Sequence, residues 1–349
     1  MSVCIFLFNV TPDLQMIAIF LAAASTPVPG AIKTFSDWTV GCDNGRSCQA
    51  IGLMREDDVS GSTMVIARGP TVDAIPEVWI VIEKSAASLL SLDGKLLPTR
   101  IENTEDGDTY ARTFVLVDRQ DRLAFIQSIR NGQQIEVLDR ARKQIGTASL
   151  RGLTAALIYM DDKQKRTGLR SALGRPGTIP DSDVEAPPAL PVIVRPKTPK
   201  LAPRRLSAAD IARETRSLEC KPGQQSGEDI TYARLDGRTT LALLPFPCGN
   251  GAYNFFSYAL LIDEKGKVRP ATFDLRGPMG DREHELVNAF WNPAARKLAT
   301  YSKGRGLGDC GVTQHYVWDG SRFRLIDQAE MHECRGSTDF IQTWIAEAR

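Results

Sequence analysis

The sequence is poor in histidine and lacks the short motifs that mark many enzyme active sites. Only three histidines occur among 349 residues, and they lie far apart: His284, His315 and His332. The chain contains no H-E-x-x-H pair, no G-x-S-x-G elbow and no G-K-[ST] phosphate loop. The sequence therefore does not support a zincin-like metal site, an α/β-hydrolase nucleophile or a P-loop.

The chain also lacks an excess of either charge. Lys and Arg together number 43, and Asp and Glu number 42. With no net field over the molecule, the composition gives no reason to expect nucleic acid or an anionic membrane surface as a partner. The apolar content of 42% is ordinary, but 349 residues exceed the usual size of one hydrophobic core. We therefore expect two domains.

The N-terminal apolar run is too short to span a bilayer. From Met16 onward, MIAIFLAAASTPVPGA is a short apolar stretch followed by small residues, typical of the core and exit of a secretory signal peptide. The upstream residues include Asp13 and no Lys or Arg, so the usual positive n-region is missing. We predict a signal-like segment over residues 1–31, with a buried N-terminal strand or helix as the alternative.

This segment predicts a periplasmic or secreted protein that is not integral to the membrane. We expect cleavage after Ala24 or Ala31. Cys4 has no small-residue lipobox before it, so no lipid anchor is expected.

Redox and zinc motifs of cysteine are absent as well, since no C-x-x-C occurs and no spacing fits a zinc knuckle. Apart from Cys4 the chain has six cysteines, an even number that suits disulfides in an exported protein. Fifteen pairings are possible for six cysteines. We favour neighbours along the chain, which gives the pairs Cys42 with Cys48, Cys220 with Cys248, and Cys310 with Cys334.

The first pair sets the register of its hairpin. Side chains on facing strands share a face when they are directly opposite, so Cys42 meets Cys48 only if the loop is centred on Gly45. A tight two-residue Asn44-Gly45 turn would instead place Cys42 opposite Ser47. We therefore predict a longer loop centred on the glycine.

Residues 32–173 are predicted to form a β-sandwich-like domain with one or two helices. Seven runs have β-branched content and partial alternation: FSDWTVGC, SCQAIGLM, STMVIAR, EVWIVIEK, ARTFVLV, QQIEVLD and KQIGTASL. RQDRLAFIQSIRNG has apolar residues at helical spacing and a terminal Asn-Gly stop signal. A second helix is expected over residues 152–168, with a buried stripe of Leu153, Ala156, Leu157 and Met160.

Residues 174–206 are dense in proline and show neither helical nor strand period, which predicts a partly extended linker. Its local basic run is interpreted as solvated, with contact to an anionic envelope surface as the alternative; the run comprises Arg195, Lys197, Lys200, Arg204 and Arg205.

Residues 207–349 are predicted to form a β-hairpin meander with one N-terminal helix. Ser207 and Asp210 offer an N-cap for a helix that runs to about Leu218. Four hairpins with turns follow: ITYARL-DG-RTTLALL, YNFFSYALLID-EKGK-VRPATFDL, VNAFWNPAARKLATYS and HYVWDGSRFRLIDQ. The whole chain is thus expected to be mainly β, with two antiparallel domains and few helices.

Six blocks are spread along the chain: F-S-D-W-T-V-G-C-D-N, S-L-R-G-L-T-A-A-L-I-Y-M-D-D-K-Q-K-R-T-G, N-P-A-A-R-K-L, K-G-R-G-L-G-D-C-G, V-W-D-G-S-R-F-R-L and M-H-E-C-R-G. Together they resemble a family of uncharacterised exported proteins of Gram-negative bacteria. The first half is also loosely similar to the invasion-associated locus B proteins, which share W-T-V-x-C and S-L-x-G-x-T-A-A-L. The resemblance implies periplasmic or secreted residence and a sandwich-like first domain. It carries over no catalytic residues.

One loop and one carboxylate pair are candidate sites. The loop KGRGLGDCG could cradle an anion through Lys303, Arg305, Gly306 and Gly308, although its glycines more simply let the chain bring Cys310 to Cys334. Asp161 and Asp162 are adjacent, so they cannot both face one site from a helix, and we expect a solvent-facing helix end there.

Two functions of different kinds follow from the sequence. The preferred one is a non-catalytic envelope protein that binds an unknown protein or glycan, with no cofactor, no metal and no catalytic residue. The alternative is an envelope hydrolase whose site assembles from distant residues such as Asp309, His315 and His284. A cleft that gathers those three groups would favour the hydrolase, and an exposed aromatic patch would favour the binding protein.

Overall fold

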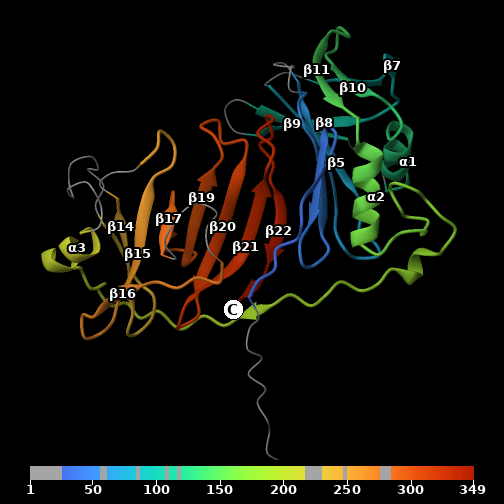
Figure 1. Ribbon diagram of the computed structural model, residues 1–349. Helices are drawn as coiled ribbons and strands as arrows, with labels where there is room; N and C mark the ends of the chain where they lie inside the picture. Colours follow the sequence, from blue (N-terminus) through green and yellow to red (C-terminus); the bar gives the residue numbers. More distant parts are fainter. Residues whose placement is uncertain are drawn as a thin grey trace, which may run out of the picture.

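The computed structural model describes residues 26–55, 61–83, 87–106, 110–115, 119–216, 230–246, 250–275 and 284–349. Antiparallel sheets dominate this part of the chain, with the helices α1, α2 and α3 at its two ends (Figure 1). The prediction of a mainly β fold with few helices is confirmed. The described residues start at residue 26, so Cys4 lies outside them, and so does most of the apolar run that begins at Met16.

The first half of the chain builds two antiparallel sheets around one core. The larger sheet has the order β1-β2-β3-β4-β5-β9-β8. Its strands are β1 (Lys33–Phe35), β2 (Trp38–Cys42), β3 (Cys48–Gly52), β4 (Thr63–Arg68), β5 (Glu77–Glu83), β8 (Ile101–Asp106) and β9 (Tyr110–Val115). The smaller sheet has the order β11-β10-β6-β7. Its strands are β6 (Leu89–Leu92), β7 (Lys95–Leu96), β10 (Gln134–Leu138) and β11 (Gln144–Ser149).

Two helices cover this core, as the spacing of apolar residues predicts. Helix α1 spans Arg119–Ile129, and α2 spans Leu153–Lys163. The expected stripe of α2 is buried, from Leu153 to Met160, and packs in the same core as Trp38 of β2. Gly152 caps α2 at a φ of 98°, where an added Cβ would lie 1.7 Å from the Phe35 carbonyl oxygen. Only glycine fits this junction between helix and sheet.

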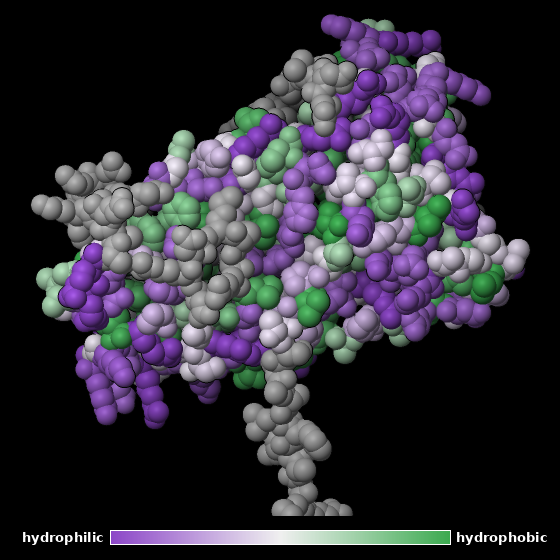
Figure 2. All heavy atoms as spheres, viewed as in Figure 1, coloured by the Kyte–Doolittle hydropathy of each residue, from purple (hydrophilic) through white to green (hydrophobic). Residues whose placement is uncertain are grey.

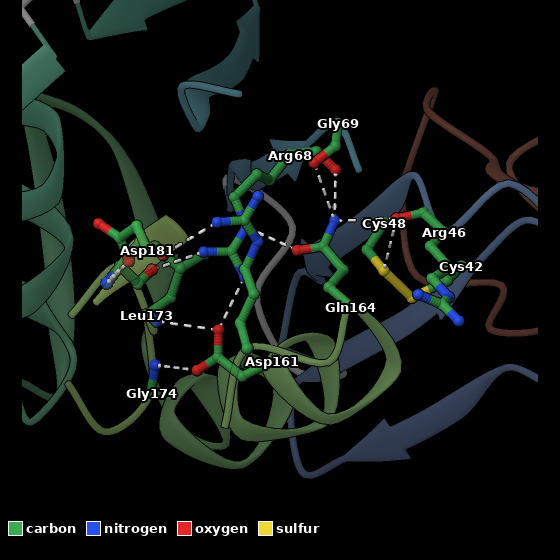
Figure 3. Close-up of polar contacts among 12 residues, drawn as sticks. Cys42, Arg46, Cys48, Arg68, Gly69, Asp161, Gln164, Leu173, Gly174 and Asp181 are labelled. Atoms are coloured by element: carbon green, nitrogen blue, oxygen red, sulfur yellow. Dashed lines mark hydrogen bonds and ion pairs between the residues drawn. A yellow bond between two sulfur atoms is a disulfide. The ribbon is translucent and has the colours of Figure 1, made fainter. Parts of the chain in front are cut away.

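The C-terminal end of α2 holds a buried ion pair (Figure 3). Arg68 Nη2 of β4 donates to Asp161 Oδ1 at 2.7 Å, and the two side chains are 1% and 4% exposed. Asp161 also accepts hydrogen bonds from the backbone N–H groups of Leu173 and Gly174, at 2.9 and 2.8 Å. Burial lowers the pKa of Arg68 to about 10, and the neighbouring Asp161 opposes that shift. The expectation of a solvent-facing helix end is wrong for Asp161 and right only for the exposed Asp162.

Residues 174–206 run extended along one edge of both halves, as Figure 1 shows. This segment contains the short 3-10 helix η1 (Asp181–Asp183) and the strand β12 (Val192–Ile193). Strand β12 pairs in parallel with β23 (Glu347–Ala348) at the end of the chain. Arg195 N–H donates to the Arg349 carbonyl at 2.7 Å. The segment is therefore bonded to the C-terminus along part of its length.

The second half of the chain contains the four predicted hairpins and the capped helix. Ser207 Oγ accepts from Asp210 N–H at 3.1 Å, and the helix α3 (Ala208–Glu214) ends four residues before the expected Leu218. One sheet has the order β13-β14-β15-β16, with β17 also paired to β15. Its strands are β13 (Thr231–Arg234), β14 (Thr240–Pro245), β15 (Phe256–Ile262), β16 (Val268–Pro270) and β17 (Glu285–Val287).

The last sheet is a continuous meander of five strands in the order β18-β19-β20-β21-β22. Its strands are β18 (Phe290–Asn292), β19 (Lys297–Lys303), β20 (Gly311–Trp318), β21 (Phe323–Met331) and β22 (Ile341–Ile345). One apolar core joins this sheet to the preceding one and includes Tyr316, Phe323 and Trp344.

The two halves share a hydrophobic cluster. Ile51, Val65 and Trp79 of the first half pack with Met331 and Ile341 of the second. Strands β3 to β5 of the larger sheet are thus covered on both faces, by the first core on one side and by this cluster on the other. In β2, Trp38 and Val40 enter the first core, and a Cβ at Gly41 would lie 2.8 Å from Ile341 Cγ2, so this strand too is buried on both faces.

Polar contacts around Arg335 fix the two halves to one another. Its Nη2 donates to Asp37 Oδ1 at 2.8 Å, and its Nε donates to the Met54 carbonyl at 2.8 Å. Met54 N–H donates in return to the Arg335 carbonyl at 3.2 Å. Burial raises the pKa of Asp37, but its bonds to Arg335 and Ser149 outweigh that effect and hold the pKa below the usual value. The carboxylate is therefore ionised at neutral pH and pairs with the arginine.

We predict that Asp161→Ala lowers the free energy of unfolding by about 3–5 kcal/mol, because it leaves Arg68 buried without its counter-charge. Urea unfolding followed by tryptophan fluorescence measures the change. Asp162→Ala is the matched control, since it alters the adjacent but exposed carboxylate and should stay within about 0.5 kcal/mol of wild type. Equal effects of the two substitutions would show that the buried pair does not stabilise this helix end.

Candidate functional site

The side chain of Asn288 joins three segments of the second half. Its Nδ2 donates to the carbonyl oxygens of Tyr253 and Tyr301, at 3.2 and 2.8 Å. Its Oδ1 accepts from Phe255 N–H at 3.1 Å, and Asn288 N–H donates to the Phe255 carbonyl at 2.7 Å. Asn288 has a φ of 46°, a left-handed conformation that asparagine tolerates better than most residues. This hub links residues 253–255, the entry to β18 and the end of β19.

Large apolar side chains are exposed on the segments around this hub. Phe255, Phe290 and Leu307 are 48%, 62% and 79% exposed, and we call these three residues the apolar patch. Gly306, next to Leu307, lies against the ring of Tyr253, since a Cβ at this glycine would be 3.3 Å from Tyr253 Cδ1. Asn288 bonds to the backbone of Phe255 and precedes Phe290 by two residues, and Leu307 follows the glycine that lies against Tyr253. The three exposed side chains therefore belong to segments that meet around Asn288.

A row of residues crosses the last sheet beside the patch. Phe290 of β18 is directly opposite Ala299, which is opposite His315, which is opposite Asp327. Directly opposite residues share one face, so this row lies on the partly exposed side of the sheet. His315 Nδ1 is 3.1 Å from Asp327 Oδ1, and Gln342 Nε2 donates to Asp327 Oδ2. The row offers a half-exposed imidazole hydrogen-bonded to a carboxylate, with Ala299 between it and the ring of Phe290.

The residues proposed for a hydrolase do not meet in one cleft. Asp309 accepts from Arg305 Nε at 2.7 Å and from Gly336 N–H at 2.7 Å, which holds its pKa below the usual value although burial opposes this. Asp309 lies in the bend before β20, whereas His315 is the fifth residue of that strand, roughly 13 Å from its first residue by strand geometry. His284 lies against the ring of Tyr258 in the other sheet. Among the described residues, no hydroxyl or thiol is hydrogen-bonded to His315 to serve as a nucleophile.

The glycine-rich loop of residues 303–311 is built around a disulfide. A Cβ at Gly304 would lie 2.7 Å from Cys310 Sγ, and one at Gly311 would lie 2.1 Å from the Ser302 carbonyl oxygen. Gly308 has a φ of 69°, and its carbonyl accepts from Tyr301 Oη at 2.5 Å. The glycines therefore bring Cys310 to its partner.

The four candidate residues for anion binding in this loop make different contacts. Arg305 is paired with Asp309, which an incoming anion would have to displace. Lys303 lies over the Tyr301 ring, with Nζ 5.5 Å from the centroid. Gly306 and Gly308 are both used by the loop's own packing. Anion binding at Lys303, Arg305, Gly306 and Gly308 stays a prediction.

Two of the three expected disulfides are present among the described residues. Cys42 is bonded to Cys48, and Cys310 is bonded to Cys334. Cys220 and Cys248 both lie outside the described residues.

The first disulfide closes the predicted kind of turn. Cys42 is directly opposite Cys48, and the loop is centred on Gly45, although the positive φ of 68° falls on Arg46. Asp43 Oδ1 accepts from the N–H groups of Gly45 and Ser47, at 2.8 and 2.9 Å, and burial raises the pKa of Asp43.

This turn bridges the two halves. Asn44 Nδ2 donates to the Ile345 carbonyl at 3.0 Å, and Ile345 N–H donates to Asn44 Oδ1 at 2.7 Å. The amide thus pairs with the edge of β22 as a neighbouring strand would. On the other side, Gln164, which directly follows α2, donates from Nε2 to the Arg46 carbonyl at 2.9 Å (Figure 3). The disulfide-closed turn therefore connects α2 with the last sheet.

Sequence reasoning missed the hub and the patch. No motif marks Asn288, and Phe255 and Phe290 lie in strand-like runs where aromatic residues are normally core. The sequence N-F-F at 254–256 carries one signal. Two successive phenylalanines in a strand point to opposite faces, so only one of them can enter a given core. In the part of the chain that the structure describes, no three His, Cys, Asp or Glu side chains are placed to hold a metal ion.

We predict that Asn288→Ala lowers the free energy of unfolding by about 2 kcal/mol or more, because it removes several hydrogen bonds and leaves alanine in a left-handed conformation. Urea unfolding measures the loss. Asn292→Ala, two residues after Phe290, removes a single exposed bond to Ala295 N–H and should cost about 1 kcal/mol or less. A smaller effect at position 288 than at 292 would contradict the role of Asn288 as the hub.

Comparison with known proteins gives a family and two relatives. Residues 32–347 match the family described as "Protein of unknown function (DUF1176)". The uncharacterized protein YpfG of Escherichia coli strain K12 is 31% identical over 322 residues, which are 87% of this chain and 89% of that protein. Among solved structures, invasion associated protein B from Bartonella henselae aligns with 39% of this chain and 99% of its own, at 12% identity and a TM-score of 0.28.

Proposed function

This chain belongs to the DUF1176 family of proteins of unknown function, and from that premise we propose that it is a non-catalytic binding protein of the bacterial envelope. The membership agrees with the resemblance seen in the sequence blocks. The observation that carries the proposal is the apolar patch of Phe255, Phe290 and Leu307. Clustered apolar side chains that stay in water lower solubility, and such patches commonly mark surfaces that contact a partner.

The features of the patch favour a protein as the partner. Leu307 is aliphatic and belongs to a loop, and phenylalanine rings carry no polar atom with which to orient a sugar hydroxyl. Aromatic anchors of this kind are enriched at the centre of protein–protein interfaces, with charged residues at the rim. Lys303 and Arg305 lie near the patch in sequence and supply such charges. On the face shown in Figure 2, hydrophobic residues interrupt a largely hydrophilic surface.

The compartment follows from the disulfides. Disulfides that link structural strands and loops are typical of an oxidising, extracytoplasmic location. None of the helices in the described ranges is long and apolar enough to cross a bilayer. We propose periplasmic or secreted residence.

Cleavage after Ala24 suits the structure better than cleavage after Ala31. Gly30 N–H donates to the Thr343 carbonyl at 2.8 Å, and the Ala31 carbonyl accepts from Tyr159 Oη at 3.0 Å. Residues 30 and 31 are therefore bonded to both halves of the protein, and removing them would lose these contacts.

The hydrolase is the weaker alternative. His315 and Asp327 form a pair that could position a general base, but Asp309 and His284 do not join it. Without a nucleophile beside the imidazole, the pair is better suited to hydrogen-bond a partner.

We predict that a photo-crosslinking phenylalanine analogue at position 290 or 255 captures a protein in the living envelope, seen as one adduct of defined mass. The control places the analogue at Val72 of the first half, whose exposure of 45% matches the 48% of Phe255. Leu307→Ser should reduce the adduct formed from position 290. No adduct from either patch position, or the same adduct from position 72, would contradict the proposal, and an adduct removed by glycosidase would replace the protein partner with a glycan.

A further inference from the structure

One stretch of the extended linker concentrates positive charge that the proposed function does not use. Residues 191–206, which we call the basic segment, carry five cations and no acid, and no Asp or Glu occurs between Glu185 and Asp210. The whole chain has a net charge of only +1, so this charge is local. It gives the molecule one basic edge, along which the linker runs in Figure 1. The five cations are Arg195, Lys197, Lys200, Arg204 and Arg205.

The body of the protein holds the basic segment in an extended form. Strand β12 pairs with β23, Thr198 Oγ1 donates to the Leu235 carbonyl at 2.8 Å, and Arg204 N–H donates to Thr240 Oγ1 at 3.1 Å. Four of its sixteen residues are prolines, which restrict the backbone further. Because the segment is already ordered, binding through it costs little backbone entropy.

The side chains that the basic segment exposes are all cationic or apolar. Ile193 and Leu206 are buried in apolar clusters, and Thr198, the single neutral polar residue of the segment, is bonded to the body. The exposed aliphatic residues are Val192, Val194 and Leu201, at 48%, 72% and 55%. The exposed cations are Lys197, Lys200, Arg204 and Arg205. This combination is typical of segments that lie on a membrane surface.

The exposed cations are available to a ligand. Lys197, Lys200 and Arg204 form no ion pair with any part of the chain that the structure describes. The nearest acids in sequence, Glu185 and Asp210, are paired with other arginines, at 2.7 and 2.9 Å. An incoming anion therefore has no carboxylate to displace from these three side chains.

The elements that touch the basic segment do not cancel its charge. The hairpins β13–β14 and β15–β16, residues 231–245 and 256–270, carry five cations and three acids, and α3 carries one arginine and two acids. The hairpin β18–β19, residues 290–303, carries three cations and no acid. Its Arg296 donates from Nη2 to the Pro196 carbonyl. Burial lowers the pKa of Arg296, and the neighbouring charge of Arg195 lowers it further.

The acids on the remaining neighbours are paired or hydrogen-bonded. The hairpin β20–β21, residues 311–331, packs on β12 and carries two arginines and three acids. Its Asp319 and the nearby Asp274 pair with these arginines, and its Asp327 is bonded to His315. At the C-terminus, Glu347 and the terminal carboxylate face one arginine. Cations and acids on all these neighbours balance to within one charge, so the five cations of the segment remain in excess.

We propose that the basic segment docks the protein on an anionic phospholipid surface. Lys197, Lys200 and Arg204 contact the headgroup phosphates, since clusters of about four to eight Lys and Arg side chains bind such surfaces. Val194 and Leu201 enter the apolar boundary just below the headgroups. The protein thereby lies on the membrane and does not cross it.

An anionic lipid suits this segment better than another polyanion does. The segment contains no aromatic ring on which a base could stack, and its extended backbone offers no helix to enter the groove of a duplex. An acidic polypeptide would use the cations alone and would leave Val194 and Leu201 in water. The basic segment shares no residue with the apolar patch, so this inference does not rest on the proposed protein partner.

Co-sedimentation of the oxidised mature chain with vesicles tests the proposal. Vesicles of phosphatidylglycerol and phosphatidylethanolamine should carry the protein down, and vesicles of phosphatidylcholine should not. Binding should fall as salt shortens the Debye length from about 10 Å at 0.1 M to about 3 Å at 1 M. Lys197→Glu combined with Lys200→Glu should lower the affinity for the anionic vesicles about tenfold or more.

Arg140→Glu combined with Lys143→Glu is the matched control. Both residues are exposed at the tip of the β10–β11 hairpin, and the change in net charge is the same. This variant should bind nearly as well as wild type. Leu201→Ser keeps the charge and should weaken binding severalfold, because it removes an apolar side chain from the boundary below the headgroups.

Absence of binding to anionic vesicles at low salt overturns the proposal. Equal weakening by the two double variants overturns it too, since that result would indicate attraction to net charge alone. Binding to soluble polyglutamate that matches binding to vesicles, and that Leu201→Ser leaves unchanged, would replace the lipid with an acidic polypeptide. Lys200→Gln combined with Arg204→Gln serves if the first double variant does not fold, and it should bind more weakly than the control.

Discussion

The turn closed by the Cys42–Cys48 disulfide is the constraint on which the arrangement of the molecule depends. It holds Asn44 where its amide can pair with the edge of β22, and it holds the Arg46 carbonyl where Gln164 can donate to it. A flexible loop would lose conformational entropy on making these contacts, whereas a loop that is already closed loses less. The second disulfide acts similarly, since Arg335 directly follows Cys334 and reaches Asp37 and Met54 in the first half. Both cross-links thus brace loops that cross between the halves.

A hydrophobic cluster also lies between the two halves. Strands β3, β4 and β5 carry apolar residues on both faces, because one face meets the first core and the other meets the second half. The halves are consequently packed as layers, with the larger sheet in the middle (Figure 1). The extended segment of residues 174–206 then lies along an edge of both and pairs with the C-terminal strand through β12.

The features that depend on local sequence pattern could be predicted. The four hairpins, the α2 stripe, the cap at Ser207 and the register of Cys42 with Cys48 all follow from spacing, turn residues and capping chemistry. The burial of Asp161 could not be predicted, because it depends on a residue that is distant in sequence. Asp161 has the local sequence of an ordinary acid at a helix end, and only the fold brings Arg68 against it. A usable signal was overlooked: runs such as TMVIAR and VWIVIE lack polar alternation, which indicates strands buried on both faces. The hub at Asn288 has no comparable local signal, since its hydrogen bonds reach two segments that are distant in sequence, residues 253–255 and Tyr301.

The apolar patch lies partly on a loop, but the Cys310–Cys334 disulfide closes that loop and Asn288 bonds the segment that carries Phe255. The most direct test of the whole account is differential scanning calorimetry of the oxidised mature chain. If the halves are joined as described, they unfold in one transition whose calorimetric and van't Hoff enthalpies agree. Two resolved transitions, each with the enthalpy of half the chain, would contradict it.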